Sequence, residues 1–180
     1  MVDDIAYPSE ILDSSTQEAF IDRRSAVWIR FLARMFDYSL VYLAVYIARK
    51  YFTSFPLYFF YYFPIEYLLF VPIESLFLRF GRASPGKMLL RMKVGQYDQP
   101  LSLKTSFRRS LKVYFRGMGL GIVWIYFFSM SVAYSRYLQT GTTAWDQEEK
   151  SEIEHKTPNS TNVLAAIFFI IFLFFFKRYA

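Results

Sequence analysis

The chain has 180 residues, of which 54% are hydrophobic and 22% are Phe, Trp or Tyr, a composition far more apolar than that of soluble domains. It has no cysteine and one histidine, which excludes disulfides, thiol chemistry and a His-rich metal site within one chain, and we expect no cofactor. The net charge of +6 is not gathered in a soluble basic domain, so nucleic-acid binding is not expected.

Long apolar runs predict an all-α membrane protein. Three runs are long enough to cross a bilayer, which takes about 20 helical residues. The last run, of about 15 residues, reaches roughly 22 Å and spans only with little tilt or local thinning of the bilayer. We therefore expect about four transmembrane helices, at residues 26–48, 55–78, 117–135 and 162–176.

The first predicted span carries three charges, Arg30, Arg34 and Asp37. Their i, i+4, i+7 spacing places them within roughly 60° of arc on one helix face. Each would cost about 2.5–3.5 kcal/mol if it faced lipid, so this face must meet protein, water or a substrate. Two interpretations remain open: an ion path or substrate contact, or a structural salt bridge between Asp37 and either arginine.

The second predicted span contains two glutamates, Glu66 near mid-bilayer and Glu74 closer to the cytoplasm. A carboxyl group at such depth is either paired with a cation or protonated. Arg30 and Arg34 are natural partners for Glu74, because all three lie toward the cytoplasmic side. Glu66 lies nearer the depth of Asp37, and two such carboxyls could hold one proton between them.

The segment at residues 79–116 is strongly basic. Its loop at 81–87 lacks the spacing and the Ser/Thr of a Walker A loop. Alternation at 88–94 predicts a strand in a cytoplasmic, β-hairpin-like loop, and residues 102–116 predict an amphipathic helix suited to anionic inner-leaflet lipids. The cations that recur every four residues along this helix, and that would contact lipid headgroups, are Arg108, Lys112 and Arg116.

Charge counting sets the expected topology. Cytoplasmic loops are rich in Lys and Arg, so the basic segment is placed inside, the acidic linker after the third span outside, and both termini in the cytoplasm. The expected organisation has four parts: an acidic cytoplasmic tail at 1–25, a membrane domain at 26–150, a polar linker at 151–161 and a C-terminal hydrophobic helix at 162–180.

Several separated motifs resemble the RDD family of small bacterial and archaeal membrane proteins. Arg30-Phe-Leu-Ala-Arg34-Met-Phe-Asp37-Tyr-Ser-Leu40 is similar to the family's first motif, and the Ser-Pro-Gly-Lys87 loop before a basic strand is similar to its second. Glu74 resembles an acidic family position ahead of that loop. In the last motif Asp146 is recognisable, with Trp145 where the family has His and no following Gly-Thr.

The resemblance implies a transport-related role, with cation–proton exchange suggested for the family. The expected functional polar face comprises Arg30, Arg34, Asp37, Glu66, Glu74, Lys87 and Asp146. If Asp146 is the second family aspartate and lies beside the basic loop, the third apolar run must be re-entrant and the fourth must cross in the opposite direction. The sequence leaves this choice open, and charge counting favours four simple spans.

Two functions follow as hypotheses. One is a transporter or transport component of a prokaryotic inner membrane that handles protons or cations. The other is a non-catalytic membrane subunit or scaffold that binds a partner membrane protein through its charged helix faces. Since the chain has no Ser/His, Cys/His or metal-ligand set, we do not expect an enzyme. Either function requires a homo-oligomer or a place in a membrane complex.

Overall fold

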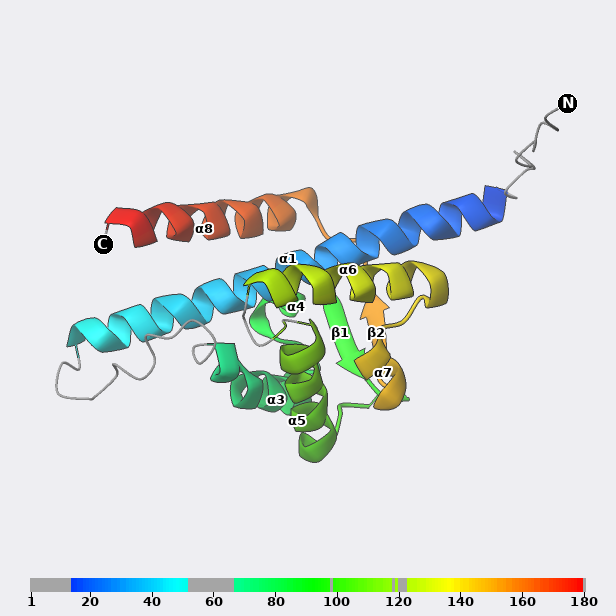
Figure 1. Ribbon diagram of the computed structural model, residues 1–180, viewed down its shortest axis with the longest axis horizontal. Coiled ribbons are helices and arrows are strands. Elements are labelled where there is room, and N and C mark those ends of the chain that lie inside the picture. The colour runs from blue at the N-terminus through cyan, green and yellow to red at the C-terminus, as the bar shows by residue number, and fades with distance from the viewer. Residues whose placement is uncertain (1–13, 52–66, 98, 118, 120–122, 180) are drawn as a thin grey trace, which may run out of the picture.

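The computed structural model describes residues 14–51, 67–97, 99–117, 119 and 123–179 (Figure 1). Helices account for most of these residues, together with one small sheet. In chain order the elements are α1 (Ser14–Tyr51), α3 (Phe70–Gly81), α4 (Pro85–Leu89), β1 (Met92–Gly95), α5 (Leu103–Lys112), the π-helical turn η2 (Val113–Gly117), α6 (Val123–Thr140), α7 (Ala144–Glu148), β2 (Glu152–His155) and α8 (Ser160–Tyr179).

Helix α1 is continuous through the end of the predicted tail and the first predicted span. Its stretch Ser25–Ala48 is the one helix in the described part of the chain that is long and apolar enough to cross a membrane. Of its most apolar 18 residues, 22% are buried within the protein, and most residues of the stretch are half-buried. The apolar part of α8, Ser160–Phe175, is shorter. The first half of the second predicted span, residues 55–66 with Glu66, lies outside the described residues.

Three long helices lie side by side (Figure 1). Helix α8 runs parallel to α1, because Val163 packs near Ala33 and the rings of Phe169 and Phe36 are 5.0 Å apart. The two helices therefore point in the same direction. Helix α6 runs antiparallel to α1, because its beginning packs on the middle of α1 and its end lies beside Arg30.

The remaining elements form a polar module on one side of α1 (Figure 1). Strands β1 and β2 pair antiparallel, from Met92 opposite His155 to Gly95 opposite Glu152. The inward side of this sheet is apolar: Val94 packs with Leu78 of α3 and Leu101. A second buried cluster joins Met92 to α1 through Ala33. The sheet thus fixes the module against the helix that carries the charged face.

The pairing of β1 with β2 contradicts the expected four-span topology. That topology placed residues 79–116 and the acidic linker on opposite faces of the membrane, yet the two segments are hydrogen-bonded neighbours. The linker expected at 151–161 contains β2, and β1 pairs with it rather than forming a local hairpin. Charge counting failed because the acids of the linker neutralise the basic segment directly, through ion pairs between α5 and α7.

The path of the chain between α5 and α6 fits the re-entrant alternative. The chain leaves the module through α5 and η2, reaches the level of Tyr38 on α1 where Tyr126 packs, and returns along α6 to α7. The predicted strand at 88–94 is also shorter than expected. Its first residues belong to α4. This helix begins at Pro85, and the first position of a helix favours proline.

Candidate functional site

Asp37 of α1 meets the beginning of α4. Its side chain is almost fully buried, and its two oxygens accept hydrogen bonds from Ser84 Oγ at 2.6 Å and Gly86 N at 2.7 Å. The first N–H groups of a helix have no partner within the helix, so a carboxylate is favoured at this point. Gly86 is required sterically, because a Cβ there would lie 2.2 Å from the carbonyl oxygen of Ala33.

The salt bridge between Asp37 and an arginine of α1, one of the two interpretations left open for this face, is wrong. Among the described residues, Asp37 lies within ion-pair distance of neither Arg30 nor Arg34. Each of the three charged side chains on this helix face instead reaches a different element of the module. The face is protein-facing, as its spacing requires.

Glu74 of α3 is the centre of the first ion-pair group. Its side chain is 1% exposed, and its two oxygens pair with Arg34 Nη1 at 2.6 Å and Lys87 Nζ at 2.5 Å. Arg109 Nη1 lies 3.9 Å from the same carboxylate. The sequence indicated Arg30 and Arg34 as partners of Glu74: Arg34 is one, whereas Arg30 pairs with Asp146 instead. Lys87 was grouped with this face by family resemblance alone.

Asp146 of α7 is the centre of the second group. Its Oδ1 accepts from Arg109 Nε at 2.8 Å and from Ser151 Oγ at 2.9 Å, and Thr143 Oγ1 donates to Oδ2 at 2.6 Å. Arg30 Nη1 lies 3.4 Å from Oδ2. Burial alone would raise the pKa of Asp146, but the guanidinium groups of Arg109 and Arg30 outweigh burial and hold this pKa below its usual value.

Arg30 and Arg109 connect these groups to their surroundings. Arg30 also donates from Nε to His155 Nε2 at 3.0 Å and lies over the ring of Tyr137, 4.4 Å from its centroid. The two groups together hold four cations and, with Asp37, three carboxylates: Arg30, Arg34, Lys87, Arg109, Asp37, Glu74 and Asp146. We call this set the charge cluster.

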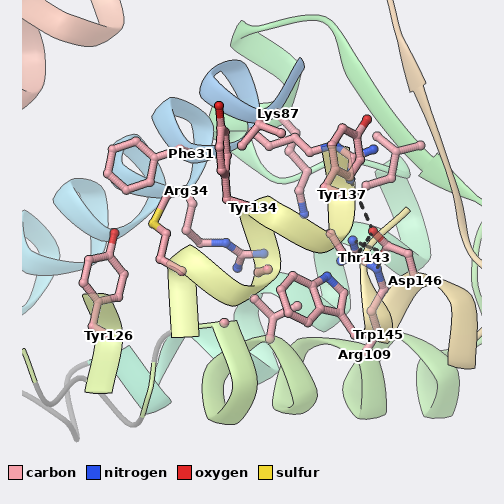
Figure 2. A pocket seen from close by; sticks show the side chains of 17 residues that line it. Phe31, Arg34, Lys87, Arg109, Tyr126, Tyr134, Tyr137, Thr143, Trp145 and Asp146 are labelled. Carbon is pink, nitrogen blue, oxygen red and sulfur yellow. Dashed lines mark hydrogen bonds and ion pairs between the residues drawn. The ribbon is translucent and has the colours of Figure 1, made fainter. Parts of the chain in front are cut away.

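A cavity of about 130 Å³ adjoins the charge cluster (Figure 2). All four cations of the cluster line it, with Asp146 as the acid among them. The rest of the wall is mainly apolar and aromatic, supplied by α1, η2, α6 and α7. Burial lowers the pKa of Lys87 to about 8; nearby Glu74 raises it, and the guanidiniums of Arg34 and Arg109 lower it further.

The expected lipid-headgroup cations differ from one another in the structure. Arg108 is exposed. Lys112 pairs with Glu149 at 2.5 Å and Glu148 at 2.8 Å, and Arg116 pairs with Glu148. Two of the three cations predicted to contact lipid headgroups thus form ion pairs with acids at α7, and their contact with lipid stays a prediction.

Sequence reasoning placed Asp146 in the site but missed its partners Arg109, Thr143 and Ser151. Arg109 is 2% exposed, and the helix face around it is made of serines, with Ser106 and Ser110 equally buried. Small residues at i, i+4 spacing allow α5 to lie close to α3, and that spacing was the available signal. Thr143 and Ser151 carry no comparable signal, since only the fold brings them to Asp146.

The fold and site define a small helical protein with an apolar helix long enough to span a bilayer and a buried cluster of Arg, Lys, Asp and Glu. The chain belongs to the RDD family, whose pattern matches residues 24–175 and whose members are generally membrane proteins. The comparisons of this chain with curated proteins and with solved structures found no match. Among the described residues, no three His, Cys, Asp or Glu side chains are grouped so as to hold a metal ion.

Proposed function

We propose that the chain is a non-enzymatic, multi-pass protein of a prokaryotic inner membrane with a transport-related role, in which Lys87 takes up and releases protons. The observation that carries the proposal is the position of Lys87. Its amino group is buried against Glu74 at 2.5 Å and lines the cavity. An arginine stays charged at any physiological pH, so Lys87 is the cluster cation that can change its charge near neutrality.

The contacts of the carboxylates favour proton handling over metal-cation handling. A bound Na⁺ requires oxygen atoms that are not committed elsewhere. Here Asp37 is held by two donors of the α4 region, Glu74 by two cations, and Asp146 by a guanidinium and two hydroxyls. Since cations outnumber acids in the cluster, an added metal cation would also be repelled.

The orientation of the helices supports a topology for this proposal. The basic module favours the cytoplasmic side, so the apolar stretches of α1 and α8 enter the bilayer from that side. Because these helices are parallel, we expect the beginning of α1 on the cytoplasmic side and the end of α8 at the opposite face, in place of the cytoplasmic C-terminus that charge counting predicted.

Proteoliposomes with an imposed pH gradient test the proposal. Lys87→Met removes the titratable group and leaves Glu74 paired with Arg34. We expect it to abolish proton flux, while Lys93→Met, at an exposed position of β1, retains it. Equal flux in wild type, Lys87→Met and empty vesicles would remove the proton-handling proposal.

A second candidate is a membrane subunit or scaffold that assembles with a partner membrane protein. The observation that favours it is that the acids and cations of the cluster bind one another and join α1, α3, α4, α5 and α7. Co-purification of a stoichiometric second chain from native membranes, together with absence of proton flux, would favour this candidate.

A further inference from the structure

We propose that the cavity binds a single anionic amphiphile, with its charged head at the charge cluster and its acyl chain directed toward the bilayer. The ligand class is a molecule with one carboxylate or phosphate head and a long apolar tail. This inference rests on the cavity and its lining, and it does not require proton movement by Lys87.

The cavity wall carries an excess of positive charge. Four cations line it, and Asp146 is the acid that lines it with them. Across the whole cluster the cations still exceed the carboxylates by one, because Arg30, Arg34, Lys87 and Arg109 face Asp37, Glu74 and Asp146. An anionic group bound here would balance the cluster.

One guanidinium nitrogen of Arg109 is a buried donor that has no acceptor among the described residues. Arg109 is 2% exposed, and its Nη1 atom is buried without a hydrogen-bond partner among the described residues. The nearest carboxylate oxygen of Glu74 is 3.9 Å away, beyond hydrogen-bond distance. Buried polar groups are almost always hydrogen-bonded. An oxyanion in the cavity would supply the missing acceptor.

The cavity is polar at one end and apolar at the other. At one end Arg109, Thr143 and Asp146 come together, and at the other lie Phe31 and Tyr126 (Figure 2). Tyr126 also packs on the apolar cluster of Tyr38 that belongs to the middle of α1. The apolar end of the cavity is therefore the end nearer the apolar cluster of Tyr38, Val41 and Phe70.

The volume of the cavity limits how much of such a ligand it can hold. A cavity of about 130 Å³ is similar to an engineered cavity of about 150 Å³ that holds benzene. It admits a head group and a few methylenes. The rest of an acyl chain must leave past Tyr126 over the surface of α6, whose Phe127 and Phe128 are 62% and 72% exposed. A water-soluble anion would gain nothing from this apolar wall.

Tryptophan quenching by brominated lipids tests the inference on the full chain. The protein has three tryptophans; Trp145 lines the cavity, while Trp28 and Trp124 are 60% and 84% exposed. A Trp28→Phe/Trp124→Phe variant in phosphatidylcholine nanodiscs therefore reports on the cavity. The probes are dibromostearate, its neutral methyl ester, and dibrominated phosphatidylglycerol and phosphatidylcholine.

We expect saturable quenching of Trp145 by dibromostearate or by the phosphatidylglycerol, but not by the methyl ester or the phosphatidylcholine. Dibromostearate and the brominated phosphatidylglycerol distinguish a free fatty acid from an anionic phospholipid, and saturable quenching by either one supports the inference. Quenching that is equal for charged and neutral probes, or that grows linearly with the lipid fraction, would overturn it.

Two variants on this background locate the binding site. Arg109→Gln should raise the half-saturating concentration by at least about tenfold, while Lys112→Gln, which removes a cation outside the cavity, should leave it unchanged. Ala133→Leu fills the cavity without changing a charge and should abolish saturation. Ala165→Leu, at an exposed position of α8, is its control. Unchanged quenching in a folded Ala133→Leu protein would show that the ligand binds elsewhere.

Discussion

Replacement of Glu74 by Gln tests whether the charge cluster holds the module to α1. Glu74 is 1% exposed and pairs with Arg34 and Lys87. Removal of one partner of a buried ion pair costs about 3–5 kcal/mol. Since Gln keeps one acceptor oxygen for one of the two cations, we expect a loss near the lower end, about 3 kcal/mol. That is a large part of the 5–15 kcal/mol that is typical for a folded protein.

A double variant isolates the electrostatic part of this loss. Lys87→Met in the Glu74→Gln background removes one of the cations that has lost its partner. We expect it to recover about 1–2 kcal/mol relative to additivity, within the range measured for contacting residues. Glu154→Gln is the matched control, because Glu154 is 46% exposed and pairs with Arg82 at the surface. It should change stability by less than about 1 kcal/mol.

The assay is equilibrium unfolding in mixed micelles, followed by tryptophan fluorescence and far-UV circular dichroism. Both probes are needed because α1 and α8 retain helix in detergent even when the module detaches. A Glu74→Gln protein as stable as wild type, or a double variant that loses the two single effects in full, would refute the view that Glu74 organises the cluster.

Three further outcomes are expected. Gly86→Ala should destabilise the protein by about 1–3 kcal/mol because its Cβ meets α1 at 2.2 Å, whereas Gly81→Ala, which meets nothing within 4 Å, should be tolerated in the same unfolding assay. Because burial lowers the pKa of Lys87 from 10.5 to about 8, the folded state loses this proton first. The free energy of unfolding should therefore rise as pH increases through that interval, and a Lys87→Met protein should lack the rise. Finally, Lys93→Cys and Glu154→Cys, which lie opposite each other in the sheet, should form a disulfide on mild oxidation of isolated membranes; separate, uncrosslinked thiols labelled from opposite faces would contradict the fold.

Local spacing was enough to find the charged face of α1. The i, i+4, i+7 positions of Arg30, Arg34 and Asp37 require a common face, and the structure turns that face inward. Spacing could not assign partners, because they come from residues 40 to 125 positions away. The choice of Glu74 for Arg34 succeeded because both were placed at similar depth.

Topology was harder to predict, for a physical reason. Counting basic residues treats each loop as an isolated charge facing the membrane. Here Lys112 is neutralised by Glu148 and Glu149 of a segment that is distant in sequence, and Met92 pairs with His155. When two loops of opposite charge bind each other, their separate charges no longer report on which side each one lies.

The unbroken length of α1 has a mechanical consequence. Its 38 residues extend about 57 Å at 1.5 Å per residue, nearly twice the roughly 30 Å of a hydrocarbon core. The module contacts α1 near its midpoint, at Ala33 and Asp37. We call the parts of α1 on either side of this contact its two arms; because the helix is unbroken, they must tilt together about the contact. Any change of bilayer thickness that tips the lipid-facing arm therefore swings the other arm through a comparable arc.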